Sequence, residues 1–162
     1  MENAGVLVAI GVGMDGRREV ISVAEGMKED AESRRSFIKG MIARGLKGVR
    51  LVTGDRCAGL VTAVGELPPD ARYQRCMVHF ERNVLARVNP KNRDWAADAL
   101  KAVFSMETRG KASGKAESVA AEMESRKLRE AAGCLRGGIG EATTYLLDDY
   151  PRGIGGASAR TT

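Results

Sequence analysis

The fold of this chain is decided by one continuous stretch, Val49 to Asn83, which reads VRLVTGDRCAGLVTAVGELPPDARYQRCMVHFERN. It begins with a short apolar run that ends in glycine and Asp55, a pattern typical of a strand buried on both faces in a parallel sheet. The residues that follow predict a helix over 57–67, a second strand over 72–79 and another helix from Phe80. Asp55 is therefore expected just past the carboxyl end of a strand, where open α/β sheets place ligands and catalytic groups.

Three side chains in this stretch carry reactive chemistry. The carboxylate of Asp55 suits Mg²⁺ or Mn²⁺, which prefer oxygen ligands. Cys76 and His79, the only histidine, stand three residues apart. They have three possible roles. As a zinc site they would supply two of the four ligands that structural zinc takes. As a catalytic pair they would be a cysteine nucleophile and its base; as structural residues they would pack and form hydrogen bonds within the fold. The residues alone leave these three interpretations open, although isolated pairs of this kind are most often structural.

The residues before this stretch predict a hairpin and a helix. Apolar residues over 5–12 and 19–24 indicate two strands, and the Asp-Gly pair within 13–16 is a strong hairpin signal. A helix is expected from about Asp30, with one apolar face that includes Met41 and with Gly45 as its C-cap. The first 79 residues therefore predict the order strand, strand, helix, strand, helix, strand.

The pattern from Phe80 onward is helical. We expect helices over 80–88, 93–106 and 111–135, a break at Gly137-Gly138, and a short helix over 142–149. The last residues, 151–162, have one bulky apolar side chain and no periodicity. Such a segment buries too little surface to offset its ordering entropy, so we predict a disordered tail.

Several motifs resemble the Mutator-type bacterial insertion-sequence transposases. They are LVTGD over 51–55, Gly59-Leu60 and YQRCMVHFERNVLARV over 73–88, with AIGV at 9–12 and DDYP at 148–151. The resemblance covers nearly the whole chain, and QRC-x-x-H-x-x-RN is its most specific part. It implies an α/β fold: a partial RNase H-like mixed sheet that lacks its first strand, followed by an all-helical insertion region. The domains expected are a catalytic core over 1–79, a helical insertion over 80–150 and the tail over 151–162.

The resemblance also implies metal-dependent DNA cleavage and strand transfer by an Asp-Asp-Glu triad with Mg²⁺ or Mn²⁺. Asp55 matches the second aspartate, and so it is the expected catalytic residue and metal ligand. The family's other two acids fall outside the matched residues, so the chain is expected to be truncated at both ends and catalytically incompetent alone. The tail is interpreted as a reading-frame slip near codon 152. Cys76 and His79 are expected to support the active site beside Asp55.

The distribution of charge points to DNA as a partner. The chain has a formal net charge of +5, and residues 71–101 hold seven basic and three acidic side chains. Arg75, Arg82, Asn83 and Arg87 are expected to contact the phosphates of transposon ends. The alternative is that some of these side chains form a solvated helical face and others cap helices. A second copy of the chain or a full-length transposase is a further expected partner.

Composition excludes several other classes of protein. An apolar content of 43% with 29% charged residues is ordinary for a soluble domain. No apolar run approaches the roughly 20 residues that span a bilayer, and no signal peptide is recognisable, so we expect a cytoplasmic protein with free thiols. Three functions remain open: a remnant of a transposase, a DNA-binding or dimerising fragment that modulates a full-length transposase, and a small α/β enzyme that uses Cys76 and His79.

Overall fold

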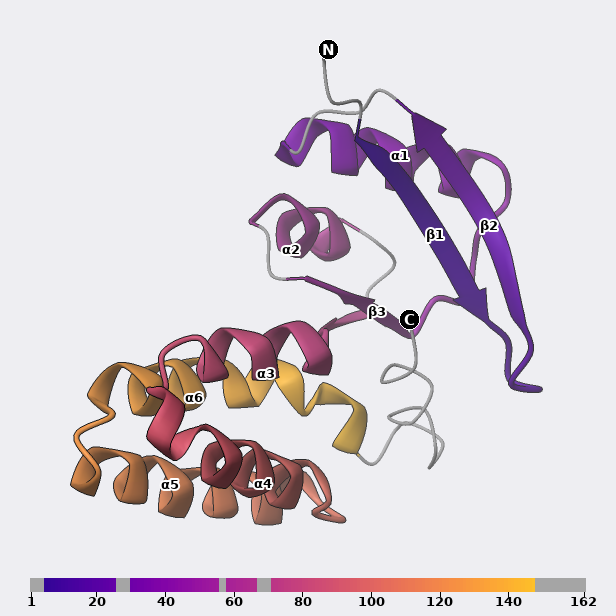
Figure 1. Cartoon of the computed structure of the whole chain (residues 1–162). Coiled ribbons are helices and arrows are strands. Elements are labelled where there is room, and N and C mark those ends of the chain that lie inside the picture. The colour runs from indigo at the N-terminus through magenta and orange to yellow at the C-terminus, as the bar shows by residue number, and fades with distance from the viewer. Residues whose placement is uncertain (1–4, 26–29, 56–57, 67–70, 148–162) are drawn as a thin grey trace. The chain divides into compact units, whose positions relative to one another are not determined.

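A computed structural model of the chain describes residues 5–25, 30–55, 58–66 and 71–147. They divide into two compact units, shown in Figure 1. The hairpin unit comprises Met1–Arg50 and Cys57–Ala71, and the helical unit comprises Leu51–Arg56 and Arg72–Thr162. This division differs from the predicted boundary at residue 79, because the strand that precedes Cys76 contacts the helices that follow it. The predicted tail over 151–162 and Cys57 lie outside the described residues.

The helical unit begins with two short strands and continues as helices. Strands β3 (Leu51–Gly54) and β4 (Arg72–Arg75) pair in parallel, with Leu51 opposite Arg72 and Gly54 opposite Arg75. The helical elements that follow are α3 (Met77–Leu85), η1 (Pro90–Asn92), α4 (Arg93–Phe104), α5 (Arg109–Ser125), α6 (Arg129–Ala142) and η2 (Thr144–Leu146). Helix α3 contacts α4 and α6, and α5 contacts the same two helices, so the four close a ring around a common core (Figure 1).

The core of this ring combines a few large side chains with many alanines. The largest fully buried apolar side chains are Phe80, Leu100, Met123, Leu135, Val84 and Val103. The Phe80 and Phe104 rings meet edge to face, with centroids 6.2 Å apart, a favoured aromatic geometry. Alanines from α4, α5 and α6 are also buried in this cluster, and their small side chains let the helices approach closely. None of the described helices combines the length and apolar character that a membrane crossing requires.

The hairpin unit contains β1 (Val6–Val12), β2 (Arg18–Glu25), α1 (Ala31–Ala43) and α2 (Ala58–Gly65). Strands β1 and β2 pair antiparallel, and α1 packs against both α2 and β2. Asp30 caps α1 by accepting from the Ser33 N–H at 2.8 Å. Gly45, at φ 103°, ends the helix, and the Leu46 N–H donates to the Met41 carbonyl oxygen at 3.0 Å. The predicted hairpin, the helix from Asp30 and its glycine cap are therefore confirmed.

The prediction of a strand extending to His79 was wrong. Strand β4 ends at Arg75, and helix α3 begins at Met77, so His79 lies in the first helical turn. The reason is the apolar spacing, since Met77, Phe80 and Val84 are all buried on one face of α3. A side chain three or four residues further on shares the same helical face, and this pattern overrides the extended tendency of the YQRC segment.

Two predictions about the later helices were also wrong. The segment expected as one helix over 111–135 is divided between α5 and α6, with Lys127 between them at φ 63°. The Leu128 N–H donates to the Met123 carbonyl oxygen at 2.8 Å, which caps α5 as glycine usually does. In contrast, α6 continues through Gly137 and Gly138. Gly138 lies against the Phe80 ring and Arg75 Nη1. This close packing holds the helix where a break was expected.

The RNase H-like arrangement of the sheet stays a prediction. Among the described residues, the strands form two separate pairs, β1 with β2 and β3 with β4. The antiparallel hairpin and the parallel pair are the strand directions expected of a mixed sheet. An RNase H-like core with its first strand missing would need a further strand to join them.

Candidate active site

Asp55 lies where the sequence predicted it, directly after a parallel strand. Strand β3 ends at Gly54, whose carbonyl oxygen accepts from the Cys76 N–H at 2.8 Å and from the Tyr73 hydroxyl at 3.1 Å. These two hydrogen bonds extend the pairing with β4 to the last residue before Asp55. The backbone that presents the carboxylate is therefore held from the neighbouring strand.

His79 is brought to Asp55 by helix α3. Its Nδ1 lies 3.2 Å from Asp55 Oδ2, and the side chains are 46% and 57% exposed, respectively. The tight turn at Cys76 makes this contact possible, because it starts α3 at Met77 and places His79 one turn beyond the end of β4. The structure thus joins two predicted site residues, 24 positions apart in sequence, in one accessible acid–imidazole pair. In such a pair the imidazole can hold the carboxylate in one orientation.

Cys76 contributes to this arrangement through its backbone. It is the N-cap residue of α3, its N–H extends the β3–β4 pairing, and its carbonyl oxygen accepts from the Phe80 N–H at 2.9 Å. In the described parts of the chain the Cys76 thiol is free, and the hydrogen bonds given above are made by its backbone. Within those residues there is also no group of three or more His, Cys, Asp or Glu side chains suited to a metal ion. The thiol-nucleophile and zinc interpretations thus gain no support.

The predicted DNA-contacting residues differ in exposure. Arg82 is exposed on α3, and Arg87 is exposed just beyond the end of that helix, where its Nη1 donates to the Asn83 carbonyl oxygen at 2.5 Å. Arg75 is only 7% exposed, and its guanidinium lies 4.7 Å from the centroid of the Phe80 ring. Its buried Nε has no hydrogen-bond partner among the described residues. This position favours a packing role for Arg75 over a phosphate contact, while DNA binding by the other three stays a prediction.

Sequence reasoning missed Gln74, the most connected polar side chain near the site. Gln74 is 1% exposed. Its Nε2 donates to the carbonyl oxygens of Arg75 at 2.7 Å and Ala142 at 2.8 Å, and its Oε1 accepts from the Tyr145 N–H at 3.0 Å. This one amide fixes the end of α6 and the start of η2 against β4. Gln74 is the first residue of the QRC-x-x-H-x-x-RN motif, but nothing in that pattern indicates a buried side chain, because a glutamine in a short strand is normally exposed.

Burial changes the acidity of two side chains close to these elements. Burial raises the pKa of the Glu81 carboxyl, and Lys101 partly opposes that rise. Burial also raises the pKa of the Tyr145 hydroxyl, which donates to the Phe104 carbonyl oxygen at 3.4 Å. Both effects disfavour the charged form, so neither group adds a negative charge to the site as readily as an exposed one would.

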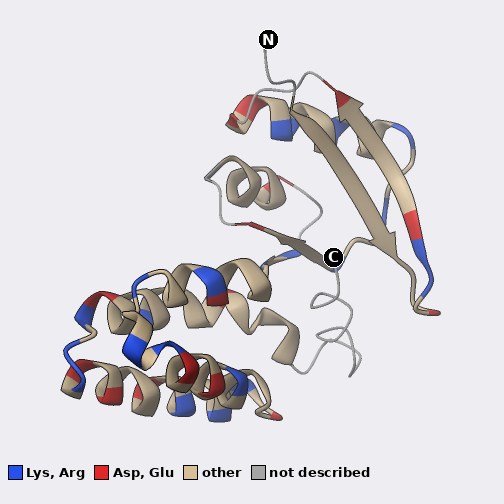
Figure 2. Cartoon of the chain, in the orientation of Figure 1, with Lys and Arg blue, Asp and Glu red and all other residues tan. Residues whose placement is uncertain are grey.

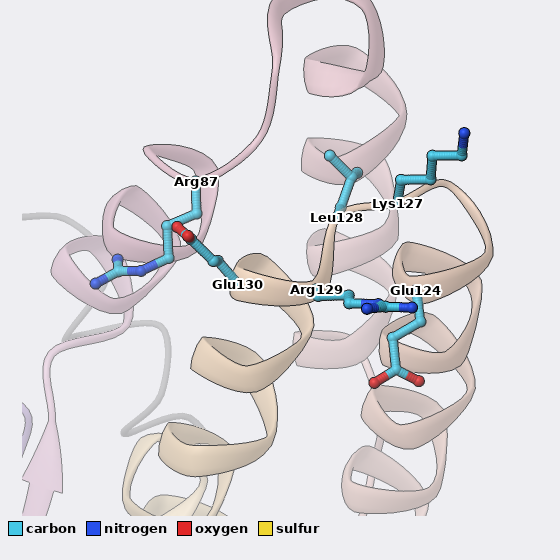
Figure 3. Close-up of a pocket in the computed structure, with 6 residues that line it drawn as sticks. All are labelled: Arg87, Glu124, Lys127, Leu128, Arg129 and Glu130. Carbon is cyan, nitrogen blue, oxygen red and sulfur yellow. The ribbon is translucent and has the colours of Figure 1, made fainter.

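A hollow of about 550 Å³ lies at the turn between α5 and α6 (Figure 3). It is lined by Arg87, Glu124, Lys127, Leu128, Arg129 and Glu130. Figure 3 shows the Glu130 side chain extending toward Arg87, whose guanidinium points away from it. Basic and acidic groups nearly balance here, so this hollow lacks the excess positive charge that an anion site needs. Figure 2 shows the same mixture of signs over the helical ends.

The donor atoms at the site do not complete a two-metal centre. Two cations about 4 Å apart require several carboxylates, and Asp55 is the carboxylate that the described structure places at this edge. Its exposed oxygens fit one ligand position of Mg²⁺ or Mn²⁺, which bind through one or two carboxylates and retain water. The chain's own described residues therefore do not fit the complete metal site that the resemblance implies.

Comparison with known proteins agrees with the motifs at this site. The family model described as "Transposase, Mutator family" matches residues 1–154. The transposase for insertion sequence element ISRM5 of Rhizobium meliloti is 42% identical over 99 residues, 61% of this chain and 25% of the relative. The transposases for IS1081 of Mycobacterium tuberculosis and for IS256 in transposon Tn4001 of Staphylococcus aureus are 37% and 36% identical, over 60% of this chain. The chain covers about a quarter of the length of these relatives. It belongs to the Mutator family of transposases.

Proposed function

We propose that this chain forms part of the catalytic region of an insertion-sequence transposase that cleaves DNA and transfers strands with Mg²⁺ or Mn²⁺. The observation that carries the proposal is Asp55, which follows a parallel strand and is paired with His79 at 3.2 Å. Family membership supports the reaction class. In this role Asp55 supplies one carboxylate ligand, and His79 holds that carboxylate in a fixed orientation.

The same geometry supports a catalytically incomplete chain. A single carboxylate cannot hold two cations, so further acidic ligands must come from outside the described residues. The chain alone is therefore expected to bind one divalent ion weakly and to transfer no strands. Its partners in the reaction are the transposon DNA ends and a transposase that supplies the other acids.

The role of Asp55 as a metal ligand is tested by adding Mn²⁺ and monitoring its binding by NMR. We expect paramagnetic broadening of the amide signals of Gly54, Asp55 and His79 in the native chain, and its loss in Asp55→Asn. The matched control is Asp98→Asn, which removes an exposed carboxylate on α4. Broadening at these amides that persists in Asp55→Asn would remove Asp55 from the metal site. Strand transfer by the native chain on a labelled transposon end would contradict the incomplete site.

The exposed arginines on α3 and just after it favour DNA binding without catalysis as a second candidate function. Arg82 is solvent-exposed on α3, the helix that carries His79, and Arg87 is solvent-exposed two residues after that helix ends. Each phosphate contact adds about one to the slope of log affinity against log salt concentration. Arg82→Gln and Arg87→Gln are each expected to lower that slope by about one. Lys115→Gln, an exposed charge on α5, is the control, and equal effects at all three positions would contradict a localised interface.

A further inference from the structure

One face of the β1–β2 hairpin is apolar and exposed. Six β-branched side chains lie on it, each between 50% and 63% exposed: Val6, Val8, Ile10, Val12, Val20 and Val23. Their cross-strand partners show that they share the face, because Val8 is opposite Val23 and Ile10 is opposite Val20. A contiguous apolar surface of this kind is uncommon on a monomer and typically marks an interaction site.

A β-bulge creates this face. Ala9 pairs with Ser22 and Ile10 pairs with Val20, so Ile21 is an extra residue in β2. Without the bulge, Val20 and Val23 would project from opposite faces, since side chains alternate along a strand. The opposite face of the hairpin is already engaged, because Arg44 of the hairpin unit donates to the Ser22 Oγ at 2.8 Å.

The charges at the ends of the face indicate what covers it. Arg18 is in register with Val12, and Glu25 is in register with Val6, so a cation stands at one end and an anion at the other. Between these ends the two strands carry one further charge, Glu19 of β2, which is in register with Gly11 and therefore lies on the opposite face. When two such faces stack with their strands antiparallel, Arg18 of one copy is opposite Glu25 of the other, twice. Stacking in the parallel sense would instead place like charges together.

We propose that this hairpin face is a two-fold interface with a second copy of the chain. Packed sheets lie about 10 Å apart with interdigitated side chains, and a two-fold axis repeats every contact. Twelve β-branched side chains would then leave water, six from each copy. This inference uses only the hairpin unit and does not depend on the transposase reaction.

Sedimentation equilibrium of the native chain, from micromolar to several hundred micromolar, tests the interface. We expect a reversible monomer–dimer equilibrium, weakened at least tenfold by Val8→Lys. The control is Val61→Lys, which changes an exposed valine on α2 and is expected to leave the dimer unchanged. A native chain that stays monomeric throughout, or equal weakening by both variants, would overturn the proposal.

A charge exchange tests the antiparallel arrangement without altering the apolar residues. Arg18→Glu and Glu25→Arg are each expected to weaken the dimer, because each creates two like-charge contacts. The double variant Arg18→Glu/Glu25→Arg restores opposite charges at both ends and is expected to recover the native association constant. Failure of the double variant to recover, with helix content unchanged by circular dichroism, would overturn this arrangement.

Discussion

Phe80 and Val84 of the helical unit are fully buried, whereas Val8 and Val20 of the hairpin unit are more than half exposed. The two units have similar apolar side chains at these positions, and the difference lies in how many neighbours each element has. Each helix of the ring packs against two others, so its apolar stripe is covered. The hairpin has a helix on one face, and its other face keeps six exposed β-branched side chains.

Apolar sequence does not by itself produce a core. Helices α3 to α6 bury single stripes, and the ring that they form is closed. A two-stranded sheet has two faces and needs a layer on each. The helical unit is therefore expected to hold most of the chain's folding free energy, and the hairpin unit to gain stability from a partner.

Removal of Phe80 should produce the largest loss of stability and would break the helical unit first. Phe80→Ala deletes a ring that packs on Phe104, Arg75 and Gly138. We expect a loss of about 3–5 kcal/mol in the free energy of unfolding, from transfer and cavity terms together. Urea denaturation followed by circular dichroism measures it. Val61→Ala, on an exposed face of the hairpin unit, should cost less than about 1 kcal/mol, and equal losses would contradict the contrast between the units.

Gln74→Met should have the next largest effect. Methionine keeps the volume but removes every hydrogen bond of the buried amide, so the Ala142 carbonyl oxygen and the Tyr145 N–H lose their partner. Unsatisfied buried groups cost about 1–3 kcal/mol each, and we expect a total loss of about 2–3 kcal/mol. Hydrogen exchange should accelerate most at Tyr145 and the end of α6. Uniform acceleration through α3 to α6 would show that Gln74 does not act as a local clamp.

A pair of glycine substitutions in α6 should change stability in opposite directions. Gly138→Ala places a methyl group against the Phe80 ring and Arg75 Nη1, and overpacking of this kind costs about 1–3 kcal/mol. Gly133→Ala meets open space in the same helix and should stabilise it by about 0.5–1 kcal/mol. Thermal melts of the two variants measure the change in stability caused by each substitution. If both substitutions stabilise the chain, the close contact at Gly138 is not rigid.

The smallest expected effect is a dependence of stability on pH at the exposed surface between α5 and α6. Arg136 donates hydrogen bonds to Glu117 and Glu124, and these bonds hold the pKa of both carboxyls below the ordinary value of 4.5. Lowered carboxyl pKa values stabilise the fold above pH 4.5, and this contribution is lost as the pH falls through the lowered values. Arg136→Gln should flatten stability against pH in that acidic range. An unchanged profile would show that the network adds nothing measurable, as is common for exposed ion pairs.

Local elements that have strong signals could be predicted from the residues alone. The apolar run before Asp55, the Asp-Gly hairpin and Gly45 each predicted an observed feature, because backbone preference and periodicity act over a few residues. The position of Asp55 after a strand followed from the same reasoning. His79 was predicted beside Asp55 through the family resemblance, although on a strand rather than on α3.

Contacts between residues far apart in the sequence depend on the packing of the folded chain. The Gln74 clamp on Ala142 and Tyr145 joins residues about seventy positions apart, and no local pattern encodes it. At Gly138 the Phe80 ring occupies the space that a side chain would need, so α6 has a glycine at this position without ending there. In the hairpin, the extra residue Ile21 places Val20 on the same face as Val23. Local preferences are similar for many arrangements, so packing, buried hydrogen bonds and strand register select the one that forms.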